Sequence, residues 1–220
     1  RGSHAHRMGR VVTHADRFAE CYRVRGVRTV EMCETLMVCM RDASFGDAVA
    51  IVDSALRKGF SKEQMQDYLD RRCRGRKGVR RARAVLDFAD GRAESGGESL
   101  ARVAMARLGF AAPELQVEVA DPLDPQSTYR CDYFWRLPQG GFLAGELDGV
   151  KKYRDERILN GRTALDVMTK ERRRESRLTL YRMPIVRFSL DEVRDEQWFE
   201  SLLDGFGVPR DERQKLRVLD

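Results

Sequence analysis

Acidic side chains that could bind a metal ion are concentrated in one stretch of the chain, residues 129–153. An aromatic and β-branched run surrounds Asp132, a proline and two glycines follow at 138–141, and the side chains of 142–148 then alternate in type. This order is typical of two strands joined by a tight turn. The sequence therefore predicts a β-hairpin that carries acids.

Side chains alternate between the two faces of a strand, so Glu146 and Asp148 share one face of the second strand. With Asp132 on the neighbouring strand, we expect three carboxylates to converge. Crowded carboxylates repel one another and lose hydration, and a hard divalent cation such as Mg²⁺ or Mn²⁺ removes that cost. The alternative is a surface turn in which Glu146 and Asp148 form salt bridges with Lys151 and Lys152.

The segment GELDGVKKY, with an acid on the preceding strand and a glutamate on a preceding helix, resembles the motif of the PD-(D/E)xK nuclease superfamily. Its acid-x-Asp-Gly form is similar to the branch related to very-short-patch-repair endonucleases. Domains of that branch often end actinobacterial proteins that begin with a winged helix like that of abortive-infection type IV antitoxins. The resemblance covers roughly residues 94–193. It implies a restriction-endonuclease-like fold and metal-dependent hydrolysis of DNA.

The resemblance also implies roles for individual acids. Asp132 and Glu146 correspond to ligands of one or two Mg²⁺ ions, and Asp148 or Glu98 would share a metal ion or position a water molecule. Glu98 also follows Ser95 at the spacing of a capping box. A local role, in which the Glu98 carboxylate accepts the Ser95 amide proton, is therefore the alternative.

Asp148 stands where the superfamily usually has a lysine, so the cationic group must come from another residue. Lys151 and Lys152 are the nearest lysines along the chain. The resemblance aligns Lys152 and Tyr153 with a recurrent Lys-Tyr pair. We therefore assign to Lys152 the role of activating the attacking water or neutralising the transition state.

Composition and charge favour a polyanionic partner. The 220 residues carry a net charge of +6, and lysine and arginine side chains release counterions when they meet the phosphates of DNA. No apolar run approaches the roughly 18 residues of a membrane span, so we expect no membrane association. Five cysteines without a CxxC pair are typical of the reduced cytoplasm and argue against a zinc site.

Other chemistries find little support in the sequence. Neither a P-loop nor a GxGxxG motif is present, so we expect no nucleotide cofactor. The three histidines lie at positions 4, 6 and 14, which leaves a serine or cysteine nucleophile in the second half without a histidine partner. The oligomeric state, including a homodimer, is left open.

A basic segment lies ahead of the acidic hairpin. Eight basic residues and no acid occur within thirteen positions: Arg71, Arg72, Arg74, Arg76, Lys77, Arg80, Arg81 and Arg83. They could form a solvated helix surface, or they could contact phosphates without reading bases. In the second interpretation the nucleic-acid contacts are Arg76, Lys77, Arg80 and Arg81.

Periodicity and punctuation divide the chain into two parts. Residues 1–92, of which 1–8 resemble an expression-tag remnant, show mostly helical patterns, and a glycine-rich break precedes 93–220. We predict that the second part is a three-layer α/β domain with a mixed sheet of about four strands, flanked by helices beginning at Glu98 and Thr163. The second helix carries charged residues to which the resemblance gives an orienting role, Glu171, Arg174 and Glu175. Trp198 is predicted to anchor the core.

The resemblance, together with the acidic hairpin and the basic charge, implies a metal-dependent endonuclease that hydrolyses DNA. The alternative is a non-catalytic, antitoxin-like regulator that binds DNA and uses a nuclease-like domain as a scaffold, because a fold does not guarantee an activity. A helical protein-interaction module would explain residues 30–90 but not the acidic hairpin.

Overall fold

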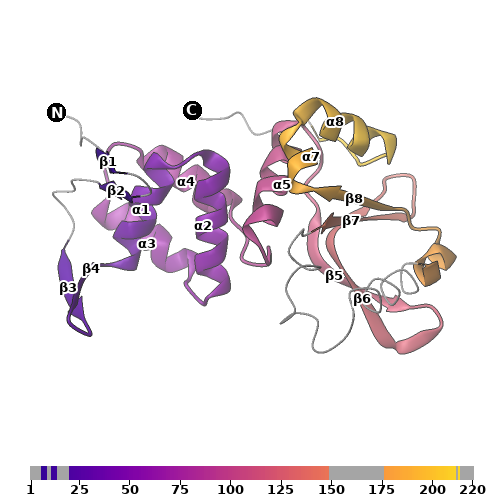
Figure 1. Ribbon diagram of the computed structural model, residues 1–220, viewed down its shortest axis with the longest axis horizontal. Coiled ribbons are helices and arrows are strands. Elements are labelled where there is room, and N and C mark those ends of the chain that lie inside the picture. The colour runs from indigo at the N-terminus through magenta and orange to yellow at the C-terminus, as the bar shows by residue number, and fades with distance from the viewer. Residues whose placement is uncertain (1–5, 9–10, 14–19, 149–175, 212, 214–220) are drawn as a thin grey trace.

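The computed structural model describes residues 6–8, 11–13, 20–148, 176–211 and 213. The chain begins with two small hairpins, and a helical region follows, ahead of the sheet as predicted (Figure 1). The hairpins and helices are β1 (His6–Met8), β2 (Val11–Thr13), β3 (Cys21–Val24), β4 (Val27–Val30), α1 (Met32–Asp42), α2 (Phe45–Arg57), α3 (Lys62–Arg72) and α4 (Val79–Phe88).

Capping residues and an apolar core explain why these helices form where they do. A capping box begins α3, since the Ser61 hydroxyl accepts the Gln64 amide proton and the Gln64 side chain accepts from the Ser61 amide. Met37, Met40 and Met65 are fully buried in the core between the helices. Each such side chain contributes about 1.5–3 kcal/mol relative to an exposed one.

The second region is α/β, with a mixed four-stranded sheet in the order β5-β6-β7-β8. Adjacent strands are antiparallel from β5 to β7, whereas β7 and β8 are parallel. The predicted helix from Thr163 falls mainly in the β7–β8 connection, outside the described residues up to 175. The elements are α5 (Gly96–Arg107), β5 (Glu114–Asp121), β6 (Asp124–Arg136), β7 (Phe142–Asp148), the 3₁₀ turn η1 (Thr179–Tyr181), β8 (Ile185–Ser189), α7 (Leu190–Arg194) and α8 (Glu196–Gly205).

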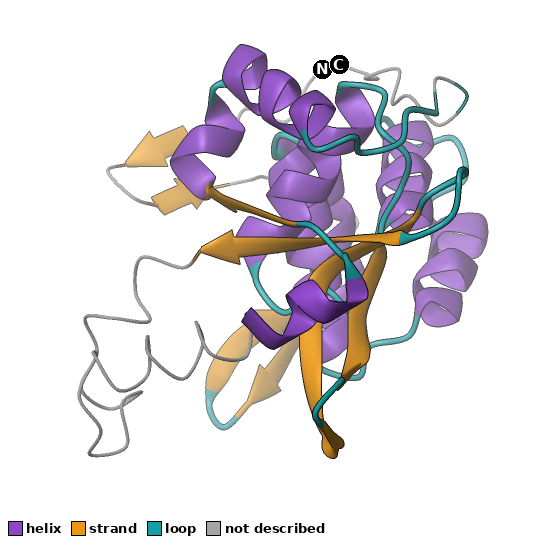
Figure 2. Cartoon of the chain, turned by 90° about the vertical axis from the view of Figure 1, so that its right-hand side faces the viewer, coloured by secondary structure: helices purple, strands orange, loops and turns teal. Residues whose placement is uncertain are grey.

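The two faces of the sheet are covered differently. Helices α5, α7 and α8 pack on one face through Met105, Val193 and Phe199, which meet aromatic and aliphatic side chains of the strands (Figure 1). On the other face, the segment around η1 packs through Leu178 and Met183 (Figure 2). Hydrophobic side chains therefore hold both faces of the sheet in place.

Helix α5 joins the two regions, because it packs against α2 on one side and against the sheet on the other (Figure 1). The two helices approach closely at Gly46, where an added Cβ would lie 2.8 Å from the end of the Leu100 side chain. The Asp53 carboxylate of α2 is fully buried and accepts a hydrogen bond of 2.7 Å from the Ser99 hydroxyl of α5. The glycine-rich break thus leads into a helix that belongs to both cores.

Two further observations complete the fold. Trp198 is 42% exposed, so the prediction that it anchors the core is wrong. Phe199 and Leu203 form the buried face of α8, and the residue before Phe199 falls at the edge of that face. Among the described residues, no helix combines the length and apolar character that a membrane crossing requires.

Candidate active site

Strands β6 and β7 separate at Asp132. Their pairing ends at Tyr133 and Gly145, and beyond this point β6 continues beside β5 while β7 continues beside β8. The Asp132 carboxylate occupies the opening, where its Oδ2 accepts a hydrogen bond of 2.9 Å from the Leu147 amide. This bond fixes one carboxylate at the base of a fork in the sheet.

Gln116 of β5 lies between two carboxylates. Its Nε2 donates to Glu98 Oε2 at 3.0 Å and lies 3.5 Å from Asp132 Oδ1. We call Glu98, Gln116, Asp132 and Glu146 the acid fork. Sequence reasoning missed Gln116, because a glutamine within an alternating strand carries no signal that it faces acids 16 and 18 residues away.

Glu98 lies in the first turn of α5 and is 7% exposed. Its carboxylate accepts from the Glu94 amide at 2.7 Å, not from the Ser95 amide of the expected capping box, while the Ser95 hydroxyl accepts from the Glu98 amide. Burial raises the pKa of the Glu98 carboxyl, and the charge of Asp132 adds to the rise. The Glu98 carboxylate therefore binds the Glu94 amide in place of the expected Ser95 amide, and Gln116 links it to Asp132.

Glu146 extends from β7 beside Tyr129 of β6. The Tyr129 hydroxyl forms a hydrogen bond with the Glu146 carboxylate. Burial and the Glu146 charge raise the pKa of that hydroxyl, so it remains a proton donor over the physiological range. Tyr129 thereby orients Glu146, a role that its position at the start of the acidic stretch does not reveal.

Asp148 forms an ion pair with Arg187 of β8. Its Oδ1 accepts from Arg187 Nε at 3.2 Å and Nη2 at 3.1 Å. In the part of the chain that the structure describes, no three acidic, histidine or cysteine side chains are grouped closely enough to hold a metal ion. Parallel β8 pairs Arg187 with Glu146 in register, and the Arg187 guanidinium reaches Asp148. Asp148 is thus held by Arg187, while Asp132 is joined to Glu98 through Gln116.

The predicted catalytic lysines, Lys151 and Lys152, lie outside the described residues. So do Tyr153 and the residues expected to orient the site, Glu171, Arg174 and Glu175. Their predicted roles remain predictions. Within the described residues, the Arg187 guanidinium brings positive charge to the end of β7.

The acid fork supplies the ligand chemistry of a hard cation. Asp132 and Glu146 contribute carboxylate oxygens from adjacent strands, and Gln116 holds Glu98 beside Asp132. Mg²⁺ prefers oxygen ligands and is often held by one or two carboxylates with several retained waters. The carboxylates of Asp132 and Glu146 are therefore ligands of the kind that fits Mg²⁺ or Mn²⁺.

The basic segment is divided by the fold into internal and exposed side chains. Arg76 is largely buried and pairs with Glu34, with its Nη2 2.5 Å from Oε1. Arg81 donates to the backbone carbonyls of Met40 and Ala43. These two guanidinium groups, predicted to contact phosphates, instead join α4 and its preceding loop to α1.

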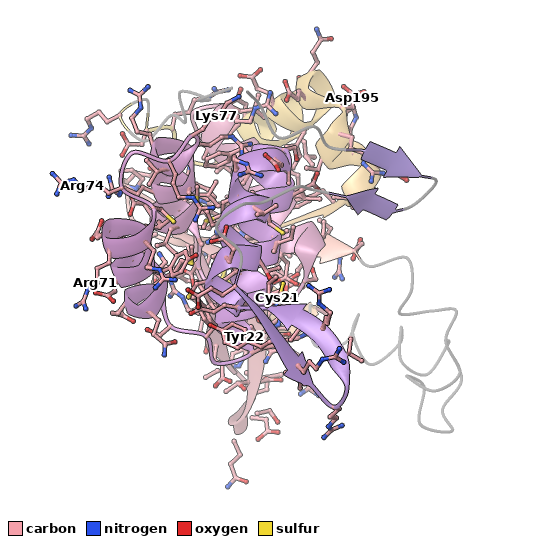
Figure 3. All side chains as sticks on the ribbon, turned by 90° about the vertical axis from the view of Figure 1, so that its left-hand side faces the viewer. Cys21, Tyr22, Arg71, Arg74, Lys77 and Asp195 are labelled. Carbon is pink, nitrogen blue, oxygen red and sulfur yellow. The ribbon has the colours of Figure 1, made fainter. Side chains whose placement is uncertain are left out.

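Lys77 and Arg80 of the same segment are exposed. Arg71 and Arg74 project outward from the side of the helical region, and Lys77 lies on the same region (Figure 3). Helices α3 and α4 lie on the far side of α2 from the sheet (Figure 1). The exposed basic side chains are therefore remote from the acid fork, despite their closeness in sequence.

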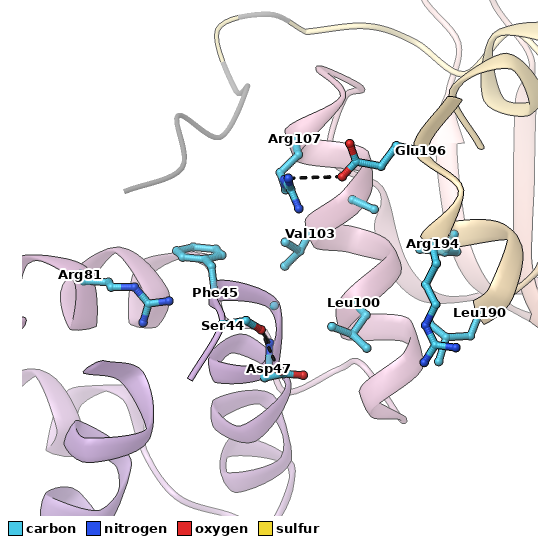
Figure 4. Close-up of a pocket in the computed structure, with 13 residues that line it drawn as sticks. Ser44, Phe45, Asp47, Arg81, Leu100, Val103, Arg107, Leu190, Arg194 and Glu196 are labelled. Carbon is cyan, nitrogen blue, oxygen red and sulfur yellow. Dashed lines mark hydrogen bonds and ion pairs between the residues drawn. The ribbon is translucent and has the colours of Figure 1, made fainter. Parts of the chain in front are cut away.

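A cavity of about 510 Å³ lies between α2, α5 and α7 (Figure 4). Its arginines already have partners in the protein: Arg107 pairs with Glu196 at 3.3 Å, and Arg194 pairs with Asp191 at 2.6 Å. No residue of the acid fork lines it. The cavity is therefore a separate feature of the junction between the two regions.

The fold and the acid fork define an α/β protein with a mixed four-stranded sheet and a preceding helical region. The chain is 34% identical over 118 residues to the uncharacterized proteins Rv2248 and MT2308 from two strains of Mycobacterium tuberculosis. The match covers 53% of this chain and 42% of each relative, so it spans less than half of their length. No family model and no solved structure matches the chain.

Proposed function

We propose that this protein is a metal-dependent endonuclease that hydrolyses DNA phosphodiester bonds. The observation that carries the proposal is the acid fork. There Gln116 holds the carboxylates of Glu98 and Asp132 together at the point where β6 and β7 separate. Exposed acids kept for solubility would lie apart on the surface, whereas Glu98 is buried and directed at Asp132.

Each residue of the acid fork has a proposed task. Asp132 and Glu146 would hold Mg²⁺ or Mn²⁺, which when bound polarises a phosphate and lowers the pKa of a water molecule. The Leu147 amide restrains the Asp132 carboxylate, and the Tyr129 hydroxyl restrains that of Glu146. Glu98 would position a water molecule beside Asp132.

The alternative function is DNA binding without cleavage, as in an antitoxin-like regulator. One observation favours it: exposed Lys77 and Arg80 belong to α4 and the loop before it, and α4 lies on the far side of α2 from the sheet (Figure 1). DNA held there would not have to reach the acids. Both functions share DNA as the partner and differ in whether the acid fork acts on it.

Incubation of the purified protein with DNA tests the proposal directly. Supercoiled, linear and single-stranded DNA should each be incubated with Mg²⁺, Mn²⁺ or EDTA and resolved on gels. We expect cleavage of at least one form with either metal ion and none with EDTA. Binding of DNA without cleavage of any form would support the regulator instead.

The lysine assignment gives a prediction about turnover. Lys152→Met should lower the single-turnover cleavage rate by about 100-fold or more and leave DNA affinity nearly unchanged, because the group acts mainly in the transition state. Lys151→Met serves as the matched control, with a cleavage rate close to that of the unmutated protein. Loss of cleavage confined to the Lys151 variant would reverse the assignment.

The exposed part of the basic segment gives a prediction about salt dependence. Lys77→Gln combined with Arg80→Gln should weaken DNA binding for all sequences and reduce the slope of log K against log salt by about two. Arg194→Gln with Arg213→Gln removes the same charge from exposed positions elsewhere and should leave the slope unchanged. If both double variants show the same slope of log K against log salt, the basic segment is a solvated surface that does not contact DNA.

Arg76 should respond differently in the same series. Arg76→Gln removes the buried partner of Glu34, so it should lower the free energy of unfolding by about 3 kcal/mol in urea titrations. DNA affinity, measured under conditions where the variant is folded, should stay close to that of the unmutated protein.

A further inference from the structure

Gln116 has a strained backbone in an unusual place. Its φ angle is +55°, a left-handed conformation that disfavours residues with a side chain. Among the described residues, two other non-glycine positions share this conformation. Arg25 lies in the turn between β3 and β4, and Arg182 ends η1, where such angles are common. Gln116 instead lies inside a strand.

The side chains of β5 change faces at Gln116. Leu115 packs with the core beneath α5, whereas Val117 packs with the core on the opposite face of the sheet. Residues two apart on a regular strand share a face, so the chain has rotated at Gln116. The pairing of β5 with β6 is also interrupted at Gln116 and Asp132, between pairs on either side.

The rotation directs the carboxamide between two acids. One amide nitrogen lies 3.0 Å from Glu98 Oε2 and 3.5 Å from Asp132 Oδ1, and the Gln116 Oε1 is buried. Two carboxylates that both approach one amide group repel each other, and the amide donor between them offsets the repulsion. A strained backbone persists only where the surroundings maintain it, and such strain is concentrated at functional sites.

We propose that Gln116 is a positioning residue that holds the Glu98 and Asp132 carboxylates in the arrangement that receives a divalent cation. This inference rests on the proposed metal-dependent function and adds a residue to its site. Strand β5 retains an unfavourable backbone conformation at Gln116 because the carboxamide is needed between the two acids. Outer residues that orient metal ligands typically change metal affinity by 10–100-fold when replaced.

Two substitutions at the same position separate positioning from stability. Gln116→Gly and Gln116→Leu both remove the carboxamide, but glycine accepts the left-handed backbone and leucine does not. We expect Mn²⁺ affinity, measured by calorimetry on the full chain, to fall about tenfold or more in both variants. The thermal midpoint of the glycine variant should exceed that of the leucine variant by about 2–4 °C.

Arg25→Gly is the matched control, since it relieves the same backbone conformation in a turn of the helical region. It should leave Mn²⁺ affinity unchanged. If Gln116→Gly binds Mn²⁺ as tightly as the unmutated protein, the inference fails while the proposed metal site stands. If the unmutated protein does not bind Mn²⁺, the proposed function and the inference both fail.

Discussion

Asp132→Asn and Glu146→Gln should each abolish Mn²⁺ binding in calorimetry and reduce DNA cleavage by more than about 100-fold. A cation shared by two carboxylates loses both charge and an oxygen ligand when either becomes an amide. The loss should exceed the roughly 10–100-fold effect of replacing an outer residue. The fold should be retained, because an asparagine oxygen can still accept the Leu147 amide proton and a glutamine oxygen can still accept from Tyr129.

Glu118→Gln provides the control for this first prediction. Glu118 is an exposed acid of β5, in the same sheet, so its replacement removes an equal charge without touching the acid fork. Mn²⁺ affinity and cleavage should match those of the unmutated protein. Unchanged Mn²⁺ affinity in both the Asp132 and the Glu146 variants would exclude the acid fork as the cation site.

Asp53→Ala should lower the free energy of unfolding by about 3 kcal/mol, measured by urea titration at neutral pH. The buried Asp53 carboxylate accepts from the Ser99 hydroxyl and from the Asp90 amide, and it lies 3.4 Å from the Arg102 guanidinium. Its removal leaves a buried cation with weaker partners, Asp90 at 3.8 Å and the Phe88 carbonyl. We therefore expect the lower end of the usual cost of breaking a buried pair.

The Asp53 prediction has a control and a pH signature. Asp87→Ala removes an exposed acid from α4 and should change the free energy of unfolding by at most about 0.5 kcal/mol. Burial raises the pKa of Asp53 above the ordinary value of 3.8, against the opposing effects of Ser99 and Arg102.

The direction of the pH effect follows from that raised pKa. The folded state binds the Asp53 proton more readily than the unfolded state. The resulting stabilisation is fully present below pH 3.8 and is lost as the pH rises through the raised pKa. The difference in unfolding free energy between the unmutated protein and Asp53→Ala should therefore grow as the pH falls from neutral towards 4. A difference that shrinks instead would mean that Asp53 ionises more readily in the folded protein.

The secondary structure around the site could largely be predicted from the sequence. Alternation over residues 142–148 corresponds to β7. The spacing of Ser61 and Gln64 likewise matches the capping box that begins α3. These features depend on residues close together in the chain, whose types and spacing determine hydrogen bonding and burial locally.

The sequence also placed Asp132 and Glu146 on adjacent strands, because a short hairpin has few alternative registers. It did not reveal that Asp148 pairs with Arg187, since their strands are adjacent only after the chain has crossed the sheet. Nor did the basic run show that Arg76 would be buried against Glu34, a residue 42 positions earlier.

Gln116 shows most clearly what local sequence patterns cannot predict. A regular pattern of alternation predicts a regular strand, yet the tertiary structure imposes a left-handed residue there and places its amide between two acids. Local patterns determine which segments form helices and strands. The partners of a buried charge or amide depend on how distant segments pack. A buried polar group loses hydration, and only a hydrogen bond to a group that packing places beside it offsets that loss.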